Sequence, residues 1–257
     1  MRVDLGFLLN ARQALLPLPL VDRAPAPPAD VLPPFRRRPA PELAGREVMA
    51  ADGSGASVGL IGIARRFEEA GERPEALSAC SASVLWAAMW AAGLSAEDMA
   101  DNALSWRPEP HLGVQWIGVP RLAFSAARGF TGLAKGAAVE ALFDRRTWHR
   151  SAGSTEIPLR TLAYDIDSKA FEWLGTEATP ELTLGELARV AIALPRKSEA
   201  VRIEGRYYVD ARAAEGFTTG LLREDERALE AGSAGWDSYG LFLDRRRWPA
   251  LIRGGYA

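Results

Sequence analysis

Three places in the 257-residue sequence combine residue types that can do chemistry, and the first is Ser81. It lies in ACSAS, residues 79–83, between a short apolar run and a strongly apolar, helix-like segment. A strand that turns at once into a helix can present a serine as a nucleophile, and the helix N-terminus favours the negative charge that develops. Such a turn needs small residues two positions before and after the serine, and Ala79 and Ser83 meet this need. An ordinary helix N-cap is the alternative, because serine is a favoured capping residue.

The second place is a run of small residues, Gly53, Ser54 and Gly55, which also stands between a predicted strand and a predicted helix. Backbone N–H groups of such a loop can point into a cleft and donate to a phosphate or to an oxyanion. The run matches neither the G-x-G-x-x-G pattern nor a P-loop, because the lysine of a P-loop is absent. Taken alone, it is compatible with many ordinary α/β turns.

The third place is Asp210, which ends the strand-like run RYYVD. An aspartate at a strand end can act as a general base or can cap the turn that follows, and the turn interpretation is favoured while Asp210 is considered alone. The sequence holds two histidines, His111 and His149. Neither histidine belongs to a recognisable catalytic motif, so we expect both to be surface or packing residues.

Taken together and in this order, the three places resemble the patatin-like phospholipase family. The family pattern has a glycine-rich loop and a helix ending in EEAG, then a G-x-S-x-G turn and a helix ending in AAG, and finally an aspartate after an aromatic–valine strand. The matching segments here are DGSGASVGLIGIARRFEEAG, ACSASVLWAAMWAAGLSAEDM and VRIEGRYYVDARAAEG. With middle segments that follow the family's order, the resemblance covers roughly residues 46–217.

The resemblance implies a serine–aspartate dyad that hydrolyses acyl lipids or smaller carboxylic esters without a cofactor. Ser81 would attack the ester carbonyl, and Asp210 would be the general base, with no histidine between them. The oxyanion would be held by the backbone N–H groups of Gly53, Ser54, Gly55 and Ala82.

Several positions depart from the family pattern, and they leave a second interpretation open. Ala79 and Ser83 replace both glycines of the turn, and the small-residue loop keeps fewer glycines than the family's. The alternative function is a catalytically degenerate member that binds an acyl lipid or a protein partner without turnover. Retention of both Ser81 and Asp210 favours the enzyme. Transfer of the acyl group to an alcohol or a thiol shares the same acyl-enzyme and also stays open.

Periodicity and turn residues predict the elements that must position these groups. Strands are predicted at residues 46–51, 75–80, 158–167 and 170–175, and a hairpin at 199–211 around Glu204-Gly205. Helices are predicted at residues 58–71, 81–93, 95–104, 132–148 and 182–194. This alternation predicts a three-layer α/β/α sandwich of the patatin type with a mainly parallel central sheet.

Within these helices the sequence also predicts core positions and ends. The candidate core residues of the helix at 58–71 are Val58, Ile61, Phe67 and Ala70. Gly71 is the expected left-handed stop, Ser95 with Asp98 is close to a capping box, and Thr183 is a predicted N-cap.

Composition divides the chain at residue 45. Residues 1–45 hold nine of the seventeen prolines and predict an extended, proline-rich arm, with a short helix at 3–16; residues 46–257 form the predicted patatin-like domain. The net charge of -2 gives no case for nucleic acid, and the single cysteine excludes an internal disulfide. No metal-ligating cluster is visible.

The sequence shows no convincing signal peptide. Its most apolar later stretch, residues 84–92, is far shorter than the roughly 20 residues that a membrane span needs. We therefore expect a cytoplasmic protein without a transmembrane segment, and peripheral contact with lipid stays open.

Overall fold

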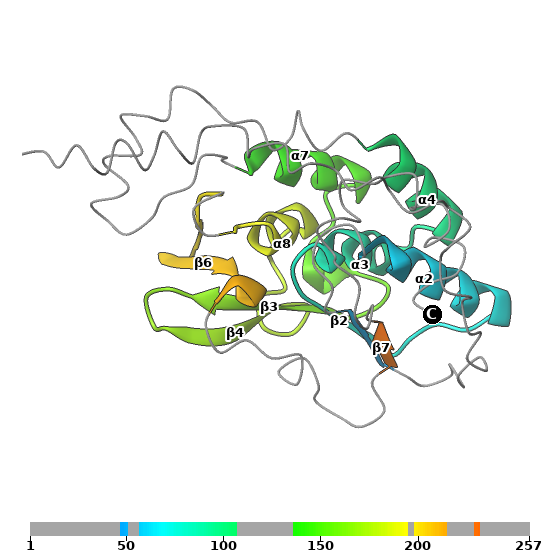
Figure 1. The fold of residues 1–257 in the computed structure, drawn as a ribbon, viewed down its shortest axis with the longest axis horizontal. Coiled ribbons are helices and arrows are strands. Elements are labelled where there is room, and N and C mark those ends of the chain that lie inside the picture. The colour runs from blue at the N-terminus through cyan, green and yellow to red at the C-terminus, as the bar shows by residue number, and fades with distance from the viewer. Residues whose placement is uncertain (1–46, 51–56, 107–135, 195–197, 215–228, 232–257) are drawn as a thin grey trace, which may run out of the picture. The chain divides into compact units, whose positions relative to one another are not determined.

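A computed structural model describes residues 47–50, 57–106, 136–194, 198–214 and 229–231 of the chain (Figure 1). All of them belong to the unit that runs from Arg38 to Ala257. Four predictions lie outside the described residues: the proline-rich arm at 1–45, the helix at 3–16 within it, the small-residue loop at 53–55 and His111. The division of the chain at residue 45 stays a prediction.

The described strands form one seven-stranded sheet. The strands are β1 (Glu47–Ala50), β2 (Ala76–Ala79), β3 (Leu159–Asp165), β4 (Ala170–Gly175), β5 (Val201–Ile203), β6 (Arg206–Asp210) and β7 (Leu229–Ala231). Their order is β5-β6-β3-β2-β1-β7, and β4 also pairs with β3. Strands β7, β1, β2 and β3 are parallel, and β5 runs the same way because it is antiparallel to β6, which is antiparallel to β3. The mainly parallel sheet of the prediction is confirmed.

The α-helices are α2 (Gly59–Ala70), α3 (Ser83–Ala91), α4 (Ala96–Ser105), α7 (Ala137–Arg146) and α8 (Leu184–Ala191). Helices α2, α3 and α8 lie against the sheet, and α4 and α7 pack on the outer side of this first layer (Figure 1). The alternation of strands and helices that the sequence predicts is therefore present, as a mixed α/β fold.

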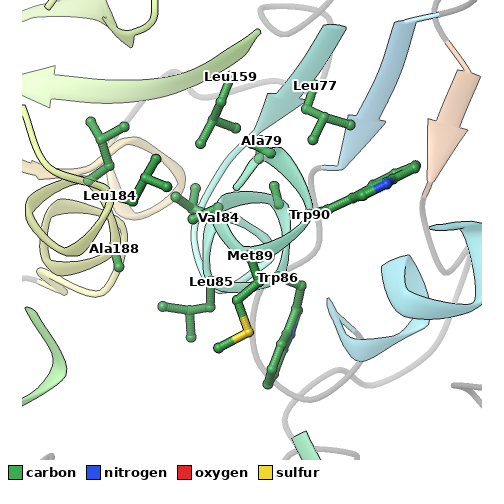
Figure 2. Packing of buried hydrophobic residues seen from close by; sticks show 14 of the residues in the cluster. Leu77, Ala79, Val84, Leu85, Trp86, Met89, Trp90, Leu159, Leu184 and Ala188 are labelled. Carbon is green, nitrogen blue, oxygen red and sulfur yellow. The ribbon is translucent and has the colours of Figure 1, made fainter. Parts of the chain in front are cut away.

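Helix α3 lies at the centre of the core, and all nine of its residues are buried. Figure 2 shows its side chains leaving the helix on several sides, with Leu77 and Leu159 of the sheet on one side and α8 beside it. A helix that is apolar on all sides is stable only when every side is buried. Side chains of other elements therefore surround the helix that follows Ser81 and fix its position.

The opposite face of the sheet is also buried around a small cluster formed by Met49, Cys80, Leu162 and Ala211. Next to it, Arg160 pairs with Glu47 at 2.6 Å, donates to Ser78 and stacks on the ring of Trp173. No described α-helix covers this face (Figure 1). The described residues thus show the sheet and the helices on one of its faces.

The predicted helix ends agree with the structure at three places. Gly71 is left-handed with φ 69°, and both Ser95 and Thr183 form complete capping boxes. The predicted hairpin is present as well, and Glu204 and Gly205 both have positive φ, as a type I′ turn requires.

Three details of the helices were predicted wrongly. Ala70 is exposed, as are Glu68 and Glu69 before it, although Val58, Ile61 and Phe67 are buried as expected. Gly136 does not lie inside a helix but precedes α7 in the left-handed conformation, with φ 67°. Helix α8 ends at Ala191, earlier than the predicted 182–194, and the proline that follows disfavours helix before it.

Candidate active site

The pairing of β3 brings the ends of two distant strands together. β2 and β6 share one edge of β3, because β4 pairs with β3 over residues 160–165 and so occupies the other edge. β2 is parallel to β3 and β6 is antiparallel to it, so their C-terminal ends run toward each other. Ala79 pairs with Thr161 and Asp210 pairs with Ala163. Residues that follow β2 therefore meet the last residue of β6.

Ser81 lies at this meeting point, in the turn between β2 and α3. Its backbone is left-handed, with φ 55°, a conformation that costs a residue other than glycine roughly 1–2 kcal/mol. Its hydroxyl donates a hydrogen bond of 2.8 Å to Oδ2 of Asp210. The interpretation of Ser81 as an ordinary N-cap is wrong, because the N-cap is Ala82 and the helix has no side-chain cap there.

Asp210 is almost completely buried and accepts hydrogen bonds from several directions. Besides Ser81, the backbone N–H of Arg212 donates to Oδ1 at 3.1 Å, and the Cys80 thiol lies 3.8 Å from the same oxygen. The side chain thus caps the short turn Ala211–Ala213 and contacts Ser81 as well. The two interpretations of Asp210 from the sequence, turn cap and base, do not exclude each other.

The electrostatics of the site follow from this burial. Burial raises the pKa of Asp210 to about 6, although the hydrogen bonds from Ser81 and Arg212 act in the opposite direction. A carboxyl group with such a pKa is ionised at neutral pH and still retains appreciable basicity. Burial, and secondarily the Asp210 charge, raises the pKa of the Cys80 thiol well above its ordinary value. Cys80 is therefore protonated at neutral pH and cannot compete with Ser81 as a nucleophile.

Of the four predicted oxyanion donors, only Ala82 belongs to the described residues. It is the N-cap of α3 and directly follows Ser81, and among the described residues its N–H donates to no acceptor. Gly53, Ser54 and Gly55 lie outside this part of the chain. The positive end of the α3 dipole and the Ala82 amide both favour negative charge beside Ser81.

Two contacts connect the neighbourhood of Ser81 to the residues that flank segment 51–56. The Cys80 N–H donates to the carbonyl oxygen of Ala50 at 3.0 Å, and the Trp86 indole donates to the Ser57 hydroxyl at 2.9 Å. The second contact cannot be predicted from the sequence, because no periodicity links a helical tryptophan to a serine 29 positions earlier.

His149 takes no part in the described site. It is exposed just after α7 and has a left-handed backbone with φ 55°. The hydrogen bonds of the Ser81 and Asp210 side chains within the described residues do not involve it.

Comparison with known proteins gives a likeness of fold rather than of sequence. No family model and no curated protein matches the sequence. Among solved structures, the type III effector protein ExoU matches with a TM-score of 0.50 and 12% identity over 82% of this chain. VipD from Legionella pneumophila matches with a TM-score of 0.42 and 15% identity over 78% of this chain. The chain spans about half of each of these proteins, 51% and 52%.

The match with ExoU supports the mixed α/β fold with a mainly parallel sheet. In the part of the chain that the structure describes, no helix is both long enough and apolar enough to cross a bilayer.

Proposed function

We propose that the protein is a serine acyl hydrolase in which Ser81 is the nucleophile and Asp210 is the general base. The observation that carries the proposal is the 2.8 Å hydrogen bond from the Ser81 hydroxyl to the buried Asp210 carboxylate. A nucleophile needs a base within about 2.6–3.2 Å, and this pair meets that requirement directly.

In the first half of the reaction, Asp210 accepts the proton of the Ser81 hydroxyl while Oγ forms a bond to the carbonyl carbon of the ester. The tetrahedral intermediate then expels the alcohol, which takes the proton from Asp210, and an acyl-Ser81 ester remains. In the second half, water loses a proton to Asp210 and attacks this ester. The free acid leaves, and Ser81 regains its proton.

The negative charge on the carbonyl oxygen is the main obstacle in both halves. The Ala82 N–H and the α3 N-terminus supply one stabilising contribution in this proposal, and the N–H groups of Gly53, Ser54 and Gly55 supply the others. Donors already oriented toward the developing charge are the largest single contribution in many acyl-transfer enzymes.

The proposed substrates are acyl lipids, including phospholipids, or smaller carboxylic esters. The patatin-like resemblance of the sequence and the likeness of the fold support this substrate class. A fold alone does not determine a function, so the proposal depends on the chemistry at Ser81. A cytoplasmic location with peripheral contact to lipid belongs to the same proposal.

Labelling with a fluorophosphonate probe tests the proposal, since the phosphorus atom reacts only with an activated serine. We expect the wild-type protein to be labelled, and both Ser81→Ala and Asp210→Asn to abolish labelling. Ser105→Ala and Asp101→Asn are the matched controls, because both positions are exposed on α4, and they should label like the wild type. Absence of labelling in well-folded wild-type protein would overturn hydrolysis and support the non-catalytic binding alternative.

A further inference from the structure

We propose that Cys80 is a positioning residue for the general base: its thiol donates a weak hydrogen bond to Oδ1 of Asp210 and so keeps Oδ2 directed at the Ser81 hydroxyl. The inference rests on the proposed function, because it concerns the base of that reaction. It gives a role to a buried thiol that the proposed mechanism does not use.

The two carboxylate oxygens of Asp210 have different partners. Oδ2 accepts the hydrogen bond of the Ser81 hydroxyl at 2.8 Å. Oδ1 accepts from the backbone N–H of Arg212 at 3.1 Å and lies 3.8 Å from the Cys80 sulfur. The torsion that exchanges the two oxygens of an aspartate has only broad preferences of its own, so the donors decide which oxygen faces which partner. With two donors on Oδ1, the carboxylate cannot turn without breaking both contacts.

Packing and the backbone together determine where the Cys80 sulfur lies. The residue is completely buried, in a cluster with Met49, Leu162 and Ala211. Its backbone N–H donates to the carbonyl oxygen of Ala50 at 3.0 Å, which continues the pairing of β2 with β1 by one residue. The other side chains of the cluster have no hydrogen to donate, so within it only the thiol can serve Oδ1.

The thiol keeps its proton over the pH range in which Asp210 titrates. Burial, and secondarily the Asp210 charge, raises the pKa of Cys80 well above its ordinary value. An S–H group is also a weaker hydrogen-bond donor than an O–H group. A donor to a carboxylate stabilises its charged form and lowers its basicity, and a weak donor does so only slightly. Cys80 can therefore orient the base and leave most of its basicity intact.

The other groups around Asp210 do not replace the thiol. From β3, Ala163 pairs with Asp210, and just after α8 the carbonyl oxygen of Ala193 accepts the Asp210 backbone N–H at 3.2 Å. Neither group ionises. Burial raises the pKa of Asp210 to about 6, while the positive charge of the exposed Arg212 acts in the opposite direction. This charge is the same in every Cys80 variant, so differences between the variants report the thiol.

Infrared spectroscopy tests the contact itself without any substrate. The chain has one cysteine, so the S–H stretching band comes from Cys80 alone. A hydrogen bond lowers the frequency of this band, and a carboxylate is a stronger acceptor than a neutral amide or carboxylic acid. We expect a lower frequency in the wild type at pH 8 than in Asp210→Asn, and a rise in the wild type as pH falls through about 6. A frequency that is equal in both proteins and independent of pH overturns the inference.

Kinetics then test whether the contact matters to the base. The measured quantity is kcat/KM for a short-chain ester at pH 5, divided by its value at pH 8. Cys80→Ala removes the donor and destabilises the carboxylate, so this ratio should fall about threefold. Cys80→Ser keeps a donor, so its ratio should stay at the wild-type value or exceed it. Leu162→Val is the matched control, because it loosens the same cluster without removing a donor, and it should keep the wild-type ratio even where stability falls.

The failure of this inference can be distinguished from that of the proposed function. An active wild-type enzyme whose ratio is unchanged in folded Cys80→Ala, or falls equally in Cys80→Ala and Cys80→Ser, overturns the inference alone. If neither variant folds, the infrared band of the wild type decides, because it needs no substitution. A well-folded wild-type protein without esterase activity or probe labelling overturns the proposed function and, with it, the role of the thiol in catalysis.

Discussion

The Ser81 hydroxyl donates a 2.8 Å hydrogen bond to Oδ2 of Asp210, and both side chains are removed from solvent, with exposed fractions of 8% and 1%. The two residues meet because β2 and β6 share one edge of β3 and point toward each other. This pair therefore depends on the register of three strands, and the properties of Asp210 follow from the same enclosed position.

The pH dependence of activity should report the ionisation of Asp210. Burial raises its pKa to about 6, and only the ionised carboxylate can accept the Ser81 proton. We expect kcat/KM for a short ester to rise with pH through an apparent pKa near 6 and to level off above about pH 7. Asp101→Asn, an exposed substitution on α4, should leave this curve unchanged. A curve that is flat between pH 5 and 8 would contradict the assignment of Asp210 as the base.

The same raised pKa predicts a cost to stability at neutral pH. The folded pKa of about 6 lies above the ordinary value of 3.8, so the folded state binds more protons than the unfolded state between these two values. The contribution of Asp210 to stability is therefore greatest below pH 4 and is lost as pH rises through 6. The free energy of unfolding of the wild type relative to Asp210→Asn should fall by about 2 kcal/mol from pH 4 to pH 7.

Urea denaturation of the two proteins at several pH values measures this difference directly. Because both curves contain the contributions of all other groups, the subtraction isolates Asp210. An opposite slope, with the wild type gaining stability relative to Asp210→Asn as pH rises, would mean that the buried carboxylate is better stabilised folded than unfolded.

The left-handed backbone of Ser81 predicts a gain in stability from glycine. Ser81→Gly and Ser81→Ala both remove the hydroxyl, but only glycine adopts φ 55° without steric cost. We expect Ser81→Gly to be more stable than Ser81→Ala by about 1 kcal/mol, measured by chemical denaturation. Equal stability of the two variants would show that the turn relaxes to another backbone conformation when the serine is lost.

The Cys80 thiol should be unreactive in the folded protein. The side chain is completely buried, so a reagent cannot reach the sulfur. Burial also raises the pKa of the thiol, so the reactive thiolate is not formed at neutral pH. A maleimide reagent at pH 7 should modify Cys80 only after denaturant is added, while a fluorophosphonate labels Ser81 under native conditions. Rapid modification of the folded protein by maleimide would show that the turn opens readily. Since Cys80 is the single cysteine of the chain, the result needs no cysteine-free background.

The strands and helices that carry Ser81 and Asp210 could be predicted from the sequence, but the contact between these two residues could not. Ser81 and Asp210 each follow a strand-like run, and turn residues with hydrophobic periodicity were enough to place both strands. That β2 and β6 would lie end to end on β3 depends on strand register, which periodicity does not contain. The residue type of Ser81 also gives no indication of its positive φ, a conformation that glycine adopts far more readily.

The differences between the predicted and the observed elements have similar causes. The pattern that marks Ala70 as a core residue describes one face of a helix, but it does not say which turns of that face are covered by other elements. Gly136 fits a helical run as well as a helix start, and only the observed backbone angle distinguishes them. Strand β7 was not predicted, because three residues are too few to show an alternation.

The chain separation of the two site residues has a consequence for folding. Ser81 and Asp210 are 129 positions apart, so their contact closes a long loop of chain, and contacts of this kind form slowly compared with helices. In a refolding experiment, α3 and α8 can regain their helical signal well before β6 has paired with β3. We expect recovery of the proposed esterase activity to lag behind recovery of the circular dichroism signal, so that activity would report the assembly of the whole sheet.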